Sequence, residues 1–95
     1  MLEKDVERRL VAQLKKLGIK HVKMSAIGQT GYPDRLIILP NKQVCWIELK
    51  APGREGNLSA RQKTVHTELR ELGHSVLVSS NVEECLEFVN GNMVA

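Results

Sequence analysis

This 95-residue chain has few aromatic side chains, two cysteines and no long apolar run, and each scarcity excludes a class of protein. Tyr32, Trp46 and Phe88 are too few for a single-strand binder that stacks successive bases on exposed rings. Cys45 and Cys85 lie far apart, outside any CxxC or Cys/His cluster, so we expect neither a zinc finger nor a disulfide scaffold. No apolar stretch approaches the roughly 18 residues of a membrane span, and the charged start MLEKDVERR is unlike a signal peptide. We therefore expect an intracellular, cytoplasmic protein without membrane contact.

The chain length and the net charge indicate the number of domains and the kind of partner. Ninety-five residues predict a single domain, 1–95, with a modest core, so a homodimer would be a natural way to bury more apolar surface. The formal net charge of +3 permits an anionic partner such as DNA. Many unrelated soluble proteins carry as much charge, so this balance alone identifies no partner.

Apolar spacing and turn residues predict seven elements in the order α-β-β-β-α-β-α. The expected helices cover residues 3–17, 59–72 and 81–90, and the expected strands cover 21–27, 35–39, 43–49 and 75–79. Three consecutive strands followed by a helical crossover to a fourth imply a mixed sheet flanked by helices, which is an α/β fold.

Local chemistry predicts where the last two helices begin and end. Ser59 followed by Gln62 is a capping box that opens one helix, and Leu72 is expected on its apolar face. Gly91 is expected to follow the final helix. The apolar tail 93–95 would then be available for contact with a second copy of the chain.

The hairpin around Pro40-Asn41-Lys42 brings charged residues together. If the turn centres on Asn41, opposite residues have numbers that sum to 82, which sets Asp34 across from Glu48 with Cβ atoms roughly 4.5 to 5.5 Å apart. A register one residue different would break this pairing. Lys50 lies two residues beyond Glu48 and projects from the same face of its strand. Two carboxylates and one ammonium group therefore converge on one patch.

Two interpretations of this patch are open, because facing like charges destabilise a hairpin unless something offsets them. In the first, Lys50 bridges both acids in a surface ion triad. In the second, a divalent cation lies between them, and two carboxylates suit Mg²⁺, which keeps most of its waters. Glu48 interrupts the apolar run VCWIEL of an interior strand, where acids are rarely buried without a partner. This context favours the cation.

Two further polar residues fall on helix faces that should point inward. Glu7 lies within the apolar arc of the first helix, where it either joins the carboxylates or extends to water. Glu3 shares that arc but sits at the fraying terminus, which makes it the poorer candidate. Gln62 shares the apolar face of its helix, and either serves only the capping box or also contacts the site.

The charged residues and the element order resemble a known nuclease signature. The dipeptide PD (33–34), thirteen intervening residues and ELK (48–50) are similar to the signature of the PD-(D/E)XK superfamily. The element order is similar to the restriction-endonuclease-like αβββαβ core of that superfamily. Within it, the segments GYPDR (31–35) and ELKAPG (48–53), with Gln62 in the next helix, resemble the VRR-NUC family. The resemblance covers most of the chain.

The resemblance implies a role for each matching position. Asp34, Glu48 and the main-chain carbonyl of Leu49 would be ligands of Mg²⁺, for which Mn²⁺ can substitute. Lys50 would be the catalytic lysine. Glu7 matches the acidic residue that the family often places in its first helix, where it would be a further ligand. Gln62 matches the glutamine that the family has in its next helix.

The activity implied by the resemblance is Mg²⁺-dependent hydrolysis of DNA by an endonuclease of phage or bacterial type. Stand-alone members resemble Holliday-junction resolvases that act as homodimers on branched DNA. The alternatives are a nickase or flap nuclease on other branched or duplex DNA, and a catalytically idle DNA-binding module of the same fold. Basic residues near the signature are candidates for phosphate contacts, namely Arg35, Lys42, Arg54, Arg61 and Lys63.

Overall fold

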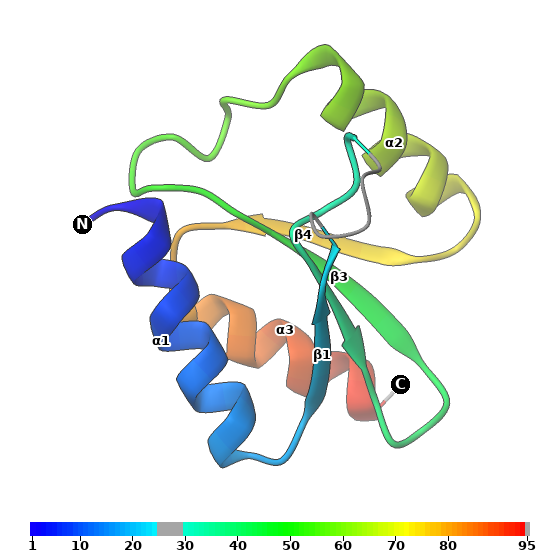
Figure 1. Cartoon of the computed structure of the whole chain (residues 1–95). Coiled ribbons are helices and arrows are strands. Elements are labelled where there is room, and N and C mark those ends of the chain that lie inside the picture. Colours follow the sequence, from blue (N-terminus) through cyan, green and yellow to red (C-terminus); the bar gives the residue numbers. More distant parts are fainter. Residues whose placement is uncertain (25–29, 95) are drawn as a thin grey trace.

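The computed structural model describes residues 1–24 and 30–94 (Figure 1). The elements are α1 (Glu3–Lys16), β1 (Lys20–Lys23), β2 (Arg35–Ile38), β3 (Val44–Leu49), α2 (Ala60–Glu71), β4 (Ser75–Ser79) and α3 (Val82–Val94). The predicted order and the α/β class are confirmed. The predicted strand 21–27 corresponds to β1, which ends at Lys23, and residues 25–27 lie outside the described part of the chain.

The strands form a mixed sheet in the order β1-β2-β3-β4. β1 pairs with β2 and β2 pairs with β3 in antiparallel fashion, and β4 runs parallel to β3. In the β2–β3 hairpin Arg35 pairs with Ile47 and Leu36 pairs with Trp46, so the numbers of opposite residues sum to 82 as predicted. β3 lies between β2 and β4, and five of its six residues are buried.

The two faces of the sheet carry separate cores. In Figure 1, α1 and α3 cover one face and α2 covers the other. Alternate β3 residues Cys45, Ile47 and Leu49 join the larger core with residues of α1 and α3. Trp46 joins the smaller core with residues of α2. By the same alternation, Glu48 projects toward the α2 face, where an acidic side chain must find polar partners.

Both ends of α2 follow the prediction, but one residue expected on its buried face does not. The Ser59 Oγ accepts a hydrogen bond from the Gln62 N–H, and the Gln62 Oε1 accepts one from the Ser59 N–H, so the capping box is formed. The expectation that Leu72 shares the buried face is wrong, because its side chain is 77% exposed. The helix ends at Glu71, and the chain turns away through Gly73 at φ +90°.

The end of α3 differs from the prediction. The helix continues through Gly91 to Val94, so the expected stop at Gly91 is wrong, and Ala95 of the predicted tail lies outside the described part of the chain. The Asn41 side-chain amide, in the β2–β3 turn, donates to the carbonyls of Asn92 and Met93 at 2.9 Å each. Met93 also packs against the larger core. These contacts offset the cost of a glycine within the helix, which is about 1 kcal/mol.

The described residues include both cysteines and every helix that could be compared with a membrane span. Cys45 and Cys85 are buried free thiols there, and burial raises the pKa of each to about 11. Among residues 1–24 and 30–94, no helix has both the length and the apolar character needed to cross a membrane.

Candidate active site

The two predicted carboxylates meet where β2 begins and β3 ends. Extending the observed hairpin register by one pair places Asp34 opposite Glu48. The Asp34 Oδ2 accepts a hydrogen bond from the Leu49 N–H at 2.8 Å, which holds the Asp34 side chain against the end of β3. Glu48 is buried, with only 2% of its surface exposed. The structure therefore brings together the acids that the hairpin register predicted.

The loop before Asp34 is seated closely on α2. Gly31 adopts φ +87°, and a Cβ atom there would lie 2.7 Å from the Arg61 Cγ and 2.9 Å from the Arg61 carbonyl oxygen. Only glycine allows both this backbone conformation and this approach. The loop that leads into Asp34 therefore lies close against the first turns of α2.

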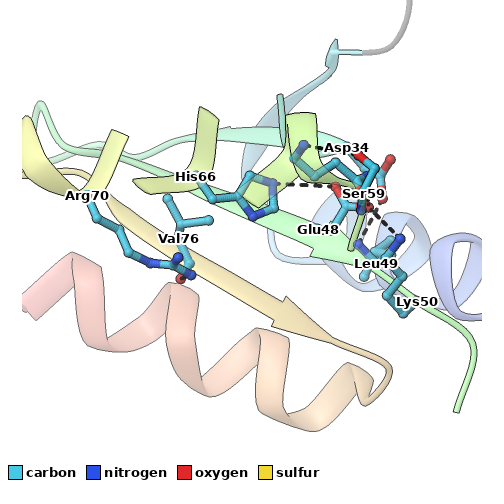
Figure 2. Close-up of polar contacts among 9 residues, drawn as sticks. Asp34, Glu48, Leu49, Lys50, Ser59, His66, Arg70 and Val76 are labelled. Carbon is cyan, nitrogen blue, oxygen red and sulfur yellow. Dashed lines mark hydrogen bonds and ion pairs between the residues drawn. The ribbon is translucent and has the colours of Figure 1, made fainter. Parts of the chain in front are cut away.

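The Glu48 carboxylate has different surroundings at its two oxygens (Figure 2). The Oε2 atom accepts a hydrogen bond from the Gln62 Nε2 at 3.1 Å and lies 3.6 Å from the Lys50 Nζ. The Oε1 atom lies 4.0 Å from the His66 Nε2 and has no hydrogen-bond partner among the described residues. One oxygen is therefore satisfied by the chain, and the other is buried without a partner.

Gln62 serves both of the roles that its sequence position suggested. Its Oε1 accepts from the Ser59 N–H at 2.9 Å and completes the capping box. Its Nε2 donates to the Glu48 carboxylate. Because an amide offers an acceptor and a donor on opposite sides, one side chain links the start of α2 to the buried acid of β3.

Lys50 is held beside Glu48 by both its backbone and its side chain. Its N–H donates to the Ser79 carbonyl at 3.0 Å, which ties the residue to the end of β4. Its ammonium group lies on the same side as the Glu48 carboxylate, as strand alternation predicted. The predicted convergence of two carboxylates and one ammonium group is thus present in the structure.

The environment of the acids disfavours their charged forms. Burial and the neighbouring Asp34 raise the pKa of Glu48 to about 7, against the opposing effect of Lys50. Burial also raises the pKa of Asp34, and the hydrogen bond from Leu49 opposes that rise. A cation placed between the acids would reverse this effect, because it favours both carboxylates in their charged state.

Side chains supply only part of the oxygen ligands that Mg²⁺ would need at this site. Among residues 1–24 and 30–94, no three Asp, Glu, His or Cys side chains lie close enough together to hold a metal ion. A cation here would depend on Asp34, Glu48 and the carbonyl of Leu49, with water completing its coordination. Mg²⁺ is commonly bound through one or two carboxylates and several waters. The buried, unpartnered Oε1 of Glu48 is consistent with such a ligand.

Glu7 does not join the two carboxylates. Its oxygens form ion pairs with Arg35 at 3.1 Å and Lys23 at 3.5 Å, and Arg35 also contacts the His21 Nδ1 at 3.1 Å. The side chain therefore neither extends freely to water nor contacts Asp34 directly. It acts at longer range, because its charge raises the pKa of Asp34.

His66 also faces the acids, although no motif in the sequence indicates it. This residue of α2 is 1% exposed, and neither ring nitrogen has a hydrogen-bond partner among the described residues. Burial, together with the charges of Arg70 and Lys50, lowers its pKa, which disfavours the charged ring. The available signal was its spacing, because a residue four positions after Gln62 lies on the same helix face.

The candidate phosphate contacts fall into three groups. Arg54, Arg61 and Lys63 are exposed in the β3–α2 loop and the first turn of α2, near the acids in the chain. Arg35 is occupied by its ion pair with an acid of α1. Lys42 lies in the β2–β3 turn, at the opposite end of the hairpin from Asp34, so its predicted proximity to the site is wrong.

A groove of about 650 Å³ lies away from this site. Its lining comes from the segments 17–20 and 38–40 and from α3 residues near the C-terminus. These residues lie at the end of the sheet opposite Asp34 and Glu48, and they are mainly apolar. The groove therefore takes no part in the arrangement of acids, amide and ammonium group.

Comparison with known proteins places the chain in a family. No family model matches the chain. The chain is 37% identical over 90 residues to a protein of Acyrthosiphon pisum secondary endosymbiont phage 1 named "Putative nuclease p44". The alignment covers 93% of this chain and 95% of the phage protein. At this identity and coverage, the chain belongs to the same protein family as that phage nuclease.

Proposed function

We propose that the protein is a Mg²⁺-dependent DNA endonuclease that hydrolyses phosphodiester bonds, with the PD-(D/E)XK signature in its VRR-NUC form. The observation that carries the proposal is the meeting of Asp34 and Glu48, two acids of raised pKa, beside the ammonium group of Lys50. The nuclease name of the phage relative supports the same activity.

Each residue has a distinct part in this proposal. Asp34, Glu48 and the Leu49 carbonyl hold Mg²⁺, with Mn²⁺ as a substitute. The bound ion supplies acidification of water and polarisation of the phosphate. Lys50 orients the attacking water and stabilises the negative charge that develops on the phosphate. Gln62 holds the Glu48 carboxylate in place through its amide N–H.

The DNA backbone would approach the exposed cations that border the site. Arg54, Arg61 and Lys63 lie in the loop after Lys50 and at the start of α2. Side chains in such positions contact phosphates without reading bases. This arrangement favours recognition of DNA shape over recognition of sequence.

We further propose branched DNA, in particular a Holliday junction, as the substrate of a homodimer. Resolving a four-way junction requires two incisions in strands related by approximate two-fold symmetry, and a C2 dimer supplies two equivalent sites. The support for self-association is apolar surface: the groove at the far end of the sheet includes Leu17, whose side chain is 59% exposed.

The test is cleavage of labelled linear, flap and four-way DNA, with and without Mg²⁺ or Mn²⁺. Wild-type protein should cut only with the metal. Asp34→Asn and Glu48→Gln should abolish cleavage yet still bind DNA, because neither acid contacts the proposed phosphate surface. Lys50→Ala should lose turnover but keep Mg²⁺ affinity in calorimetry, since its ammonium group is not a ligand. Metal-dependent cleavage by both acid variants would overturn the metal assignment.

A further inference from the structure

The His66 and Glu48 side chains place two unsatisfied polar atoms face to face in the protein interior. The His66 Nε2 lies 4.0 Å from the Glu48 Oε1, and neither atom has a hydrogen-bond partner among the described residues. Figure 2 shows the imidazole directed toward the carboxylate. Buried polar groups are normally hydrogen-bonded, so this pair requires an explanation.

Core packing does not explain a histidine at this position of α2. Its neighbours Val65 and Leu69 belong to the smaller apolar core, where an apolar side chain would be buried without leaving polar atoms unpaired. Arg70, one turn further along α2, donates to the Val76 carbonyl at 3.0 Å and is directed away from the site (Figure 2). Glu48 is thus the acceptor that the ring faces.

The separation of 4.0 Å is too long for a direct hydrogen bond. It can be closed by a small rotation of the carboxylate or spanned by one water that contacts both atoms. A neutral imidazole with its proton on Nε2 donates in either arrangement. The Oε2 atom already accepts from Gln62, one turn earlier on the same helix.

We propose that His66 is a positioning residue that donates through Nε2 to the Oε1 of Glu48, so that α2 holds both oxygens of a metal-binding carboxylate. Gln62 and His66 act as a pair at i and i+4. Each carboxylate oxygen keeps a second lone pair for a cation. Hydrogen bonds of this kind fix the orientation of metal ligands. The inference rests on the proposed function, in which Glu48 is a ligand.

The test compares His66→Gln, His66→Asn and His66→Leu with wild-type protein. A glutamine amide reaches the position of Nε2, whereas an asparagine amide reaches only that of Nδ1, and leucine has no donor. His66→Leu and His66→Asn should raise the Mg²⁺ concentration for half-maximal cleavage about 10- to 100-fold. They should also weaken Mg²⁺ or Mn²⁺ binding in calorimetry without DNA. His66→Gln should restore most of both properties, and DNA binding in EDTA should not change.

Leu69→Ala is the matched control, because this core residue lies on the same face of α2 one turn beyond the site. It should lower the melting temperature without changing the Mg²⁺ requirement. If it shifts metal dependence as much as His66→Leu does, His66 has only a packing role. If His66→Leu does not fold, the inference is tested by comparing His66→Gln with His66→Asn. Equal metal affinity in these two variants would overturn it. Wild-type protein that neither binds metal nor cleaves DNA would instead refute the proposed function.

Discussion

At the scale of single residues, Glu48 shows how a strand interior can carry a charge. It occupies a buried position of β3 where alternation would otherwise place an apolar side chain. Gln62 and Lys50 satisfy one oxygen, and His66 faces the other. Burying an acid in this way costs stability unless its charge is paired. The cost is consistent with a residue kept for chemistry and not for packing.

The raised pKa of Glu48 predicts how the stability of the metal-free protein depends on pH. The folded state holds the Glu48 proton more tightly than the unfolded state, in which the pKa is about 4.5. The contribution of this group to the free energy of unfolding is therefore complete below about pH 4.5. It falls as the pH rises to about 7, where the folded group titrates. Each pKa unit corresponds to about 1.4 kcal/mol.

Urea denaturation of wild-type protein and Glu48→Gln, in EDTA across this pH range, measures that contribution. Other titrating groups are common to both proteins, so the informative quantity is the difference between their unfolding free energies. The variant should gain stability relative to wild type as the pH rises. A difference that stays constant with pH would show that Glu48 keeps an ordinary pKa.

At the scale of elements, the site depends on how helices and strands are joined. The capping box of α2 also holds the acid of β3, because Gln62 belongs to both. Gly31 lets the loop before β2 approach α2. In the same manner Asn41, in the β2–β3 turn, ties the hairpin to the last turn of α3. Side chains at the ends of elements therefore set the relative positions of distant segments.

The contact between Asn41 and α3 can be tested without disturbing the candidate active site. Asn41→Ala should lower the free energy of unfolding by about 1 to 3 kcal/mol, since two hydrogen bonds to helix carbonyls are lost. Asn41→Asp keeps the oxygen that accepts from the Gln43 N–H but has no amide donor, and it adds negative charge at a helix C-terminus. It should be at least as destabilising as the alanine variant.

The measurements for this contact are urea denaturation and amide hydrogen exchange. Exchange of residues in the last turn of α3 should be faster in both Asn41 variants, whereas Mg²⁺ binding at the distant acids should be unchanged. A stable Asn41→Asp protein with normal exchange would contradict this prediction. It would mean that Asn41 contributes to the free energy of unfolding through its side-chain oxygen in the turn, and not through the contact with α3.

At the scale of the whole molecule, the acids and the apolar groove lie at opposite ends of the sheet. A self-contact through the groove would leave both sets of acids accessible to DNA. This separation is compatible with the proposed dimer, in which each copy makes one incision.

The dimer proposal predicts paired, symmetric cuts on a four-way junction. Mixed dimers with one Glu48→Gln subunit should leave singly nicked junctions, because one of the two sites is inactive. Light scattering alongside mapping of the cut positions tests both statements. A monomer at micromolar concentration that cuts linear duplex as readily as junctions would favour a nickase instead.

The amino-acid sequence by itself determined the order of elements, the hairpin register and the identity of the acids that meet. These features depend on local periods and turn chemistry: alternation along strands, helical spacing, and the turn around Asn41. The convergence of Asp34, Glu48 and Lys50 follows from register alone, since the hairpin places its own partners. For the same reason the capping box of α2 was predictable from a four-residue pattern.

Only the tertiary structure decided which residues from other elements surround the acids. Glu7 is held by Arg35 and Lys23, and His66 faces Glu48, because α1 and α2 pack on the sheet at particular rotations and heights. The continuation of α3 through Gly91 likewise depends on a turn side chain some fifty residues earlier in the chain. Such contacts are set by the packing of whole elements against one another, and no local spacing in the sequence encodes that packing.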